Sequence, residues 1–248
     1  MSDESHSYAN LMYEKRLYRN KMHADGLEYF HVVEYETDLL IAANTDMSFQ
    51  ARNSVHETRK ILEDYGQCYP EFFTALEPLE IKRKDPLMIR RMKSAAKTVG
   101  VGPMAAVAGA VSQAVGRALL KKSSEVIVEN GGDLFVKTSK KRWVAIDAGK
   151  SEFKELSIVV KASEHPLGIC TSSGTMGHSL SFGKADAATV ISSDVYLADA
   201  AATALGNRIK RYEDIEDAIK WAKSINGIRG VLIIVENRMG AWGEIELG

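Results

Sequence analysis

The sequence predicts an α+β fold in which one order of elements, strand–strand–helix–helix–strand–strand, occurs twice. Two β-branched and aromatic runs open the first half, and Gly131-Gly132 separates a later pair of strand-like runs, which is typical of a hairpin. The second half shows the same order of strand-like and helix-like patterns. No residue-level repeat accompanies it, so the predicted duplication depends on element order alone.

The first half begins with two strands and a helix. Strands are expected over Leu27–Tyr35 and Asp38–Asn44, with Glu36-Thr37 as the turn between them. A helix is expected over Ser48–Gly66, because its apolar residues approximate a stripe at helical spacing and Ser48 is a suitable N-cap.

A basic helix, a glycine break and a hairpin complete this half. The helix is expected near 86–98, and Gly100–Pro103 then interrupts the pattern. Pro103 suits the first turn of a second helix over Met104–Lys121. Strands over Glu125–Asn130 and Asp133–Thr138 flank the two glycines of the predicted hairpin.

The second half is expected to repeat this order around an insertion. Its elements are strands over Arg142–Asp147 and Glu155–Lys161, helices over Val195–Leu205 and Ile215–Ser224, and strands over Arg229–Val235 and Ala241–Leu247. The loop and strand over Gly168–Ser192 are the predicted insertion. The chain therefore divides into an N-terminal arm, residues 1–20, and one domain, residues 21–248, with repeats at about 21–140 and 141–248.

The composition is that of a globular protein. Of 248 residues, 45% are hydrophobic and 26% are charged, and the net charge of -1 gives no bulk attraction to nucleic acid or to an anionic membrane. Cys68 and Cys170 form neither a disulfide framework nor a zinc site of thiolates, which favours a reduced, cytoplasmic setting. The polar N-terminus does not resemble a signal peptide, and the uncharged run Thr98–Gly116 is too rich in small residues for a membrane span.

The polar segment Gly168–Gly183 is the strongest candidate for a site. It combines a thiol, an imidazole, several hydroxyls and four glycines, and such a loop can surround a polar or anionic ligand with N–H and O–H donors. These donors would stabilise a nucleophilic thiolate at Cys170, with His178 as its base. The alternative, a buried strand cysteine that packs as a small hydrophobe, stays open.

Asp199 and Thr203 form a second candidate. They are four residues apart on a predicted helix, so both point from one face. A carboxylate and a hydroxyl supply hard oxygens of the kind that Mg²⁺ prefers. The alternative is a solvated aspartate and a hydroxyl at the edge of the core. The neighbours Ala198–Ala204 are small or apolar, however, so an aspartate here needs a partner. Asp194 is expected to cap the same helix.

Two glycine turns are further candidates. Gly102-Pro103 opens a predicted helix, whose free N–H groups and positive dipole end would bind an anion. Asn130-Gly131-Gly132-Asp133 is a hairpin turn that would offer backbone N–H groups and the Asp133 carboxylate to a ligand. At both positions the pattern alone favours the structural alternative: close helix packing at the first and a simple turn at the second.

Four segments together resemble the uncharacterised branch of the ApbE-like superfamily. They are Gly102–Gly109, Glu129–Asp133, Pro166–Gly183 and Leu197–Asn207. The resemblance runs roughly from Arg16 to the end of the last segment. It implies a duplicated T-fold, ββααββ twice, with an insertion in the second half. The enzymes of the superfamily are magnesium-dependent FAD:protein FMN transferases, which attach FMN through its phosphate to a threonine or serine of a target protein.

The resemblance also implies roles for the candidate residues. Asp199 and Thr203 would be magnesium ligands, and His178 resembles the histidine downstream of the transferases' Thr-Ser-Gly segment. The residues expected to bind FAD or FMN combine the anion site at Gly102 with the hairpin turn and the hydroxyl-rich loop. They are Gly102, Asn130, Gly131, Gly132, Asp133, Thr171, Ser172, Ser173, Gly174 and Thr175.

Departures from the transferases make transfer chemistry doubtful. The segment at Pro103 lacks the lysine of their Ser-Gly-x-x-Lys-Gly-like motif. The segment His178-Ser179-Leu180-Ser181 lacks the aspartate and proline of their His-x-x-Asp-Pro motif, and no lipoprotein leader is evident. The resemblance therefore implies binding of a flavin or another phosphate-bearing ligand, with Mg²⁺, more strongly than it implies transfer.

Two other functions stay open. Cys170 could carry a persulfide to a sulfur-transfer partner in cysteine or homocysteine synthesis, because it is not a transferase residue and this branch is linked to sulfide assimilation in anaerobes. Alternatively, the chain is a non-enzymatic partner subunit, in which Arg90, Arg91 and Lys97 contact an acidic partner. Neither nucleic acid nor a membrane is expected as a partner, and a homo-oligomer is compatible with the sequence.

Overall fold

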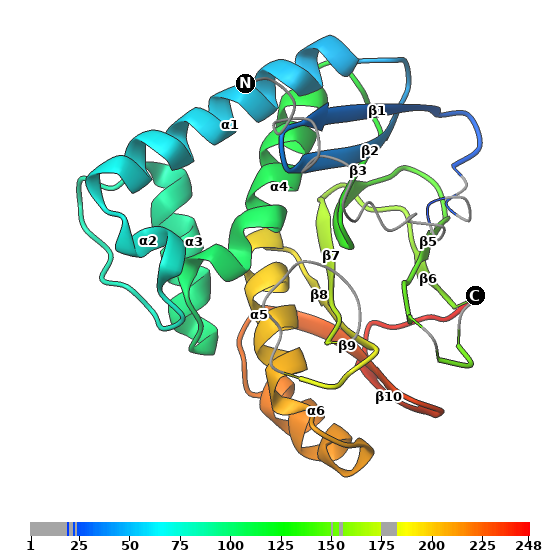
Figure 1. Ribbon diagram of the computed structural model, residues 1–248. Coiled ribbons are helices and arrows are strands. Elements are labelled where there is room, and N and C mark those ends of the chain that lie inside the picture. The colour runs from blue at the N-terminus through cyan, green and yellow to red at the C-terminus, as the bar shows by residue number, and fades with distance from the viewer. Residues whose placement is uncertain (1–18, 20–21, 23, 150, 154–155, 175–182) are drawn as a thin grey trace, which may run out of the picture.

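One antiparallel sheet of eight strands forms the centre of the protein, and helices cover one of its faces (Figure 1). The computed structural model describes residues 19, 22, 24–149, 151–153, 156–174 and 183–248. The strands lie in the order β1-β2-β3-β4-β7-β8-β9-β10. Their bounds are β1 Glu28–Glu34, β2 Thr37–Ala43, β3 Val126–Asn130, β4 Asp133–Lys137, β7 Leu167–Ser172, β8 Ala187–Ser192, β9 Ile228–Val235 and β10 Arg238–Gly243.

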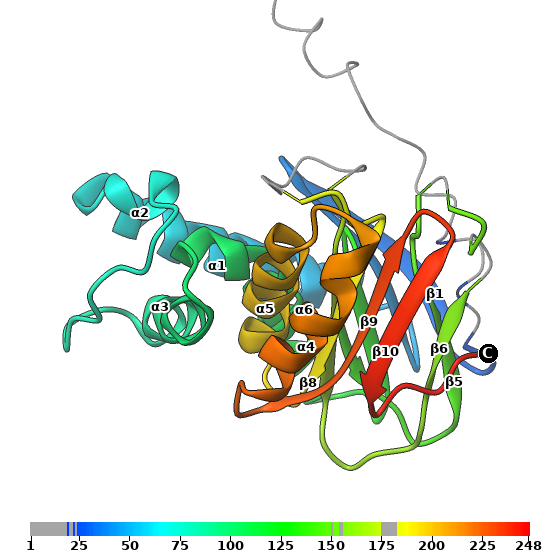
Figure 2. The same cartoon turned by 90° about the horizontal axis from the view of Figure 1, so that it is seen from below.

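The helices divide into a layer on the sheet and an arm that projects beyond it. Helices α4, α5 and α6 lie against one face of the sheet, whereas α2 and α3 extend away from it beyond the long helix α1 (Figure 2). The bounds are α1 Ser48–Cys68, α2 Glu71–Thr74, α3 Leu87–Val99, α4 Val107–Leu119, α5 Val195–Arg208 and α6 Ile215–Lys223, with short 3₁₀ turns at Pro103–Ala106 and Tyr212–Asp214.

Both faces of the sheet are buried. Because side chains alternate along a strand, Leu39 and Ile41 of β2 enter the core under the helices, whereas Leu40 and Ala42 enter a second core on the opposite face. A small sheet of β5, Arg142–Ala145, and β6, Ser157–Val160, covers this second face (Figure 2). Every residue of Thr37–Ala43 is accordingly buried.

The predicted insertion is placed wrongly. The strands expected at Arg142–Asp147 and Glu155–Lys161 are present in shorter form, but they pair with each other outside the main sheet, and Ile158 forms a further bridge to Leu247 near the C-terminus. The segment predicted as the insertion, Gly168–Ser192, instead contributes β7 and β8 to the main sheet. The hydroxyl-rich end of β7 obscured a strand that central pairing with β4 and β8 stabilises. The mixed fold with an antiparallel sheet is confirmed, and its duplication as a T-fold stays a prediction.

Several predicted boundaries are confirmed and others shift. Asp194 caps α5, since its side chain accepts a hydrogen bond of 3.1 Å from the N–H of Tyr196. Ser48 does not cap α1, because the helix begins at Ser48 itself and its N–H donates to Asp46. The last strand is Arg238–Gly243 rather than Ala241–Leu247. No single helix among the described residues is long and apolar enough to cross a bilayer, although the bent pair α3 and Pro103–Leu119 passes by length and composition.

Candidate functional site

The candidate site lies at one end of β4 and β7, under helix α5. These two strands pair antiparallel with Asp133 directly opposite Cys170. Cys170 belongs to the core under the helices, and its Sγ atom lies 3.9 Å from the carbonyl oxygen of Val195 in α5. The sequence-predicted polar segment and the helix that bears Asp199 are therefore in contact.

Asp199 connects α5 to the beginning of α4. Its Oδ2 atom accepts a hydrogen bond of 2.7 Å from the backbone N–H of Gly109, in the first turn of α4. A Cβ atom on Gly109 would lie 2.9 Å from the Cβ of Asp199 and 2.8 Å from the carbonyl oxygen of Val195. Glycine at position 109 therefore allows the two helices to approach closely enough for this contact.

The Asn130–Asp133 turn reaches the same place. Gly131 and Gly132 have φ angles of 64° and 101°, which glycine adopts without strain in a tight hairpin turn. The N–H of Thr171 in β7 donates to the carbonyl of Gly132 at 3.1 Å. The side-chain amide of Asn130 donates to the carbonyl of Ala108 at 3.1 Å, so the turn, β7 and the start of α4 meet.

Two buried carboxyl groups, Asp133 and Asp199, lie in this cluster. Asp199 is 7% exposed and Asp133 is 9% exposed. Burial raises the pKa of Asp199 to about 7, against hydrogen bonds from the N–H groups of Gly109 and Ala108 that lower it. Burial, and then the charge of Asp199, raise the pKa of Asp133 well above its usual range. Among the described residues, no lysine, arginine or histidine forms an ion pair with either group.

Ser172 adds an unsatisfied hydroxyl. Its side chain is on the same face of β7 as that of Cys170, because the two residues are two positions apart on a strand. Ser172 is 6% exposed, and its Oγ atom has no hydrogen-bond partner among the described residues. Buried hydroxyls are normally paired, so this one is a candidate donor to a ligand.

The environment of Cys170 favours the second of the two alternatives, a buried strand cysteine. The residue is fully buried, whereas Cys68 is exposed. Burial, together with the charges of Asp133 and Asp199, raises the pKa of the Cys170 thiol well above its ordinary value. A raised pKa favours the neutral thiol near neutral pH. This agrees with the alternative in which Cys170 packs as a small hydrophobic residue.

Other predicted site residues have varied positions. Ser173 and Gly174 follow β7 directly, and Thr203 lies half-buried one turn beyond Asp199. Gly102 is buried, and a Cβ atom there would lie only 1.8 Å from the carbonyl oxygen of Ala75. Close packing therefore accounts for the glycine at 102. Thr175 and His178 lie outside the described residues.

The helix expected over Met104–Lys121 begins later than predicted, which moves the N-terminus on which the expected anion site depends. Pro103 begins a 3₁₀ turn, and the α-helix starts only at Val107. The N–H of Gly109 at this later start is occupied by the protein's own carboxylate, Asp199. The helix dipole places a partial positive charge at the N-terminus of α4, and the carboxylate of Asp199 already compensates part of it.

The basic residues proposed for partner contact are partly engaged within the chain. The guanidinium of Arg91 lies 4.9 Å from the ring centroid of Tyr196 and 3.8 Å from the carboxylate of Asp194. Arg90 and Lys97 are exposed on α3.

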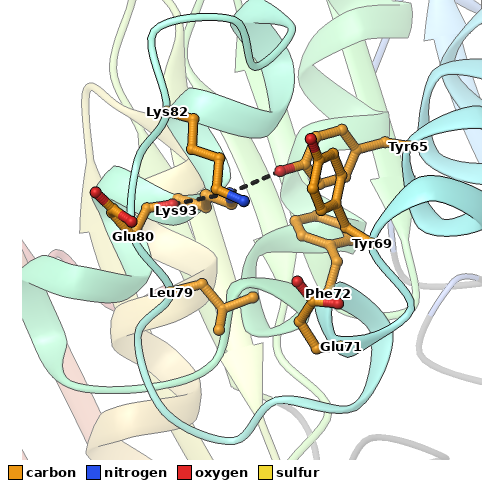
Figure 3. Close-up of a pocket in the computed structure, with 8 residues that line it drawn as sticks. All are labelled: Tyr65, Tyr69, Glu71, Phe72, Leu79, Glu80, Lys82 and Lys93. Carbon is orange, nitrogen blue, oxygen red and sulfur yellow. Dashed lines mark hydrogen bonds between the residues drawn. The ribbon is translucent and has the colours of Figure 1, made fainter.

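A pocket of about 210 Å³ lies elsewhere, in the helical arm (Figure 3). None of the predicted site residues lines it. Its buried Lys93 directs Nζ toward Tyr65 and donates at 2.8–2.9 Å to Tyr65 Oη, Asp85 Oδ2 and the Glu80 carbonyl. Since an ammonium has three N–H donors, Lys93 has none left for a ligand, and we interpret this network as a structural anchor of the arm.

Sequence reasoning missed the contacts beneath the site. Glu129 accepts a hydrogen bond of 2.8 Å from the N–H of Gly132 and is itself bonded to Arg19, 110 residues earlier. A glutamate within an apolar strand, Val126–Asn130, was the available signal. Among the described residues, no group of three or more His, Cys, Asp or Glu side chains is arranged to hold a metal ion.

Comparisons with known proteins agree with this architecture. A family model described as AbpE bacteria matches residues 19–247. A UPF0280 protein of Methanosarcina acetivorans is 41% identical over 213 residues, covering 85% of this chain and 84% of that protein. A UPF0280 protein of Methanosarcina barkeri is 40% identical over 230 residues, covering 90% and 91% respectively.

Two solved structures show a similar fold. The apo flavinyl transferase ApbE of Pseudomonas stutzeri matches with a TM-score of 0.53 and 15% identity, covering 88% of this chain and 94% of that chain. The flavin transferase ApbE from Vibrio cholerae matches with a TM-score of 0.55 and 12% identity, covering 88% and 97%. At these identities the likeness is one of fold.

Proposed function

We propose that this chain, which belongs to the family described as AbpE bacteria and to an uncharacterised branch of the ApbE-like proteins, binds a flavin or another phosphate-bearing ligand together with Mg²⁺. The observation that carries the proposal is the pair of buried carboxyl groups, Asp133 and Asp199, with no described basic partner. The charge of Asp199 raises the pKa of Asp133, and two buried acids that repel each other are unfavourable unless they are protonated or a cation lies near both.

The donor set fits a hard cation. Asp199 and Thr203 offer a carboxylate and a half-buried hydroxyl one turn apart on α5. Oxygen ligands of this kind suit Mg²⁺, which keeps its other positions for water or phosphate. When bound, Mg²⁺ would supply the positive charge that attracts a ligand's phosphate oxygens. Asp199 and Thr203 would hold the metal.

Neutral donors beside these acids suit the ligand. The Ser172 hydroxyl, which has no hydrogen-bond partner in the described part of the chain, lies on the helix-facing side of β7. The Gly131-Gly132 turn is at least partly exposed and has no side chains to exclude an approaching flavin ring. The solved proteins of similar fold are a flavinyl transferase and a flavin transferase, which makes a flavin the first ligand to test. The absence of the transferases' lysine near Pro103 leads us to propose binding rather than transfer.

The test is a titration of the purified chain with FMN and with FAD, followed by flavin fluorescence, with Mg²⁺ and with EDTA. We expect micromolar binding that Mg²⁺ strengthens at least tenfold, and a loss of this Mg²⁺ effect in Asp199→Asn. Asp194→Asn is the matched control, because it makes the same substitution on the same helix and asparagine is an equally good N-cap. It should bind as the wild type does.

Two outcomes would overturn the proposal. One is no binding of either flavin at high micromolar concentration. The other is binding that Asp199→Asn and Asp194→Asn leave equally unchanged. A sulfur relay through Cys170 is not favoured, because the thiol is buried and its pKa is raised, whereas transfer of a persulfide requires an accessible thiolate.

A further inference from the structure

We infer that Arg19 is a positioning residue for the candidate site, and that it acts through Glu129 on the Gly131-Gly132 turn. The inference deepens the proposed function, since it concerns the same ligand site. Side chains alternate along a strand, and Val128 and Leu39 enter the core under the helices, so their neighbours Glu129 and Asp38 face the other side. Arg19 bonds to these two acids and therefore lies on the face opposite Asp133, away from a ligand bound under the helices. Its effect must therefore pass through the strand that separates the two faces.

Glu129 is the connecting group. Its side chain is fully buried in β3, and its two oxygen atoms have different partners. Oε1 accepts a hydrogen bond of 2.8 Å from the N–H of Gly132, whereas Oε2 accepts one of 2.6 Å from Nε of Arg19. One carboxylate thus joins residue 19 to the backbone of the turn.

Arg19 is itself fixed to the neighbouring strand. Its Nη1 atom lies 3.0 Å from both carboxylate oxygens of Asp38, and Nη2 donates to the Asp38 carbonyl at 2.9 Å. The Arg19 side chain is only 9% exposed and that of Asp38 7%. The planar guanidinium can satisfy both acids at once, which the single ammonium of a lysine cannot do with the same geometry.

The turn that Arg19 supports sets the position of Asp133. Gly132 immediately precedes Asp133, and its backbone is bonded on both sides, by its N–H to Glu129 and by its carbonyl to the N–H of Thr171. Removing the guanidinium takes away the hydrogen bond and the positive charge that Arg19 supplies at Oε2 of Glu129. The carboxylate is then held less firmly, and its bond from the Gly132 N–H at Oε1 opens more readily.

The experiment compares Arg19→Ala, Arg19→Lys, Glu129→Gln and the double variant Arg19→Ala/Glu129→Gln in the full chain. Amide hydrogen exchange at Gly132 reports the turn without any ligand, with Leu232 in the centre of β9 as the reference amide. FMN titration with Mg²⁺ reports the site. Arg52→Ala, which breaks an exposed ion pair with Glu34 on β1, is the matched control.

We expect Arg19→Ala to speed exchange at Gly132 at least tenfold with Leu232 unchanged, and to weaken FMN binding about tenfold, the effect typical of residues that orient binding groups. Arg19→Lys should recover part of both. In Glu129→Gln, the amide oxygen of the glutamine can still accept the hydrogen bond from Gly132, but it has no charge for Arg19 to pair with. Adding Arg19→Ala to this variant should therefore change the affinity for FMN less than twofold. Equal effects of Arg19→Ala in both backgrounds would overturn the inference.

The two proposals fail separately. If the wild type binds no flavin but Gly132 exchange follows Arg19 and Glu129 as expected, the proposed function is wrong and the positioning of the turn stands. If flavin binds but neither Gly132 exchange nor affinity responds to Arg19→Ala, the inference is wrong and the proposed function stands.

Discussion

The Asp199 carboxylate accepts a hydrogen bond of 2.7 Å from the backbone N–H of Gly109, so helix α5 caps the N-terminus of helix α4. The acid comes from 90 residues further along the chain. The usual N-cap is a side chain at the start of the same helix, and it remains hydrated. Here the capping carboxylate comes from another helix and is buried between the two. The raised pKa of Asp199 follows from this burial.

This pKa predicts how stability depends on pH. The folded pKa of about 7 exceeds the ordinary 3.8, so between these values the folded state binds more protons than the unfolded state. The contribution of Asp199 to the free energy of unfolding therefore falls as pH rises from about 4 to about 7. Asp199→Asn should remove this slope and be more stable than the wild type at pH 8 by on the order of 2 kcal/mol.

Urea denaturation of both proteins at pH 5 and pH 8, in EDTA, measures the effect. The amide oxygen of asparagine can still accept from Gly109, so the capping contact is retained while the charge is removed. A stability difference between the variant and the wild type that is the same at both pH values would contradict the raised pKa of Asp199.

Gly109→Ala tests the close approach of the two helices. Alanine is favoured over glycine within a helix by about 1 kcal/mol, so propensity alone predicts a gain in stability. The added Cβ would however meet the Val195 carbonyl oxygen at 2.8 Å, and overpacking of this kind costs about 1–3 kcal/mol. We expect a net loss in chemical denaturation. Ala114→Gly, in the same helix, measures how much the difference in helix propensity between alanine and glycine changes the free energy of unfolding. A higher free energy of unfolding for Gly109→Ala would show that α4 and α5 can separate.

The two cysteines provide an internal comparison of reactivity. Cys68 is exposed and Cys170 is fully buried with a raised pKa. Iodoacetamide at pH 7.5 should therefore add one label, on Cys68, in the folded protein and two labels in urea, as read by peptide mass spectrometry. Labelling of Cys170 in the folded protein at a rate close to that of Cys68 would restore the sulfur-relay hypothesis.

Local patterns predicted most elements of the fold because their signals lie within a few residues. The Gly131-Gly132 hairpin has positive φ at both glycines, as two glycines between strands predict. The strand Ala187–Ser192 and the cap at Asp194 also agree. β7 was missed because Cys170–Ser172 is polar, and its strand character depends on pairing with β4 and β8.

The site was only partly predictable, for a related reason. The chemistry of Asp133, Cys170 and Asp199 made them candidates. Pairing of β4 with β7 brings the first two together, and packing of α5 on β7 adds Asp199. Of the two alternatives for Cys170, burial favours the packed cysteine over the thiolate, and this burial under α5 is not visible in the local sequence. Arg19 could not be connected to the site from sequence, because its link through Glu129 spans 110 residues.

The buried pair Lys93 and Asp85 supports a last prediction, about the helical arm. Their side chains are 3% and 0% exposed, and Tyr65 donates a hydrogen bond of 2.9 Å to Asp85 while it accepts one from Lys93. Lys93→Met would leave the aspartate buried without a counter-charge, at a cost of about 3–5 kcal/mol in urea denaturation. Lys60→Met, which breaks an exposed pair with Asp64, should change stability by less than about 1 kcal/mol.

The double variant Lys93→Met/Asp85→Asn separates charge from packing in this network. Removing both charges relieves the unpaired aspartate, so the double variant should lose less stability than Lys93→Met alone. The asparagine retains an oxygen for the hydrogen bond from Tyr65. A double variant that is as unstable as the sum of the two single variants would show that Lys93 acts through its packing and its bond to the Glu80 carbonyl, and that the ion pair contributes little to holding the arm.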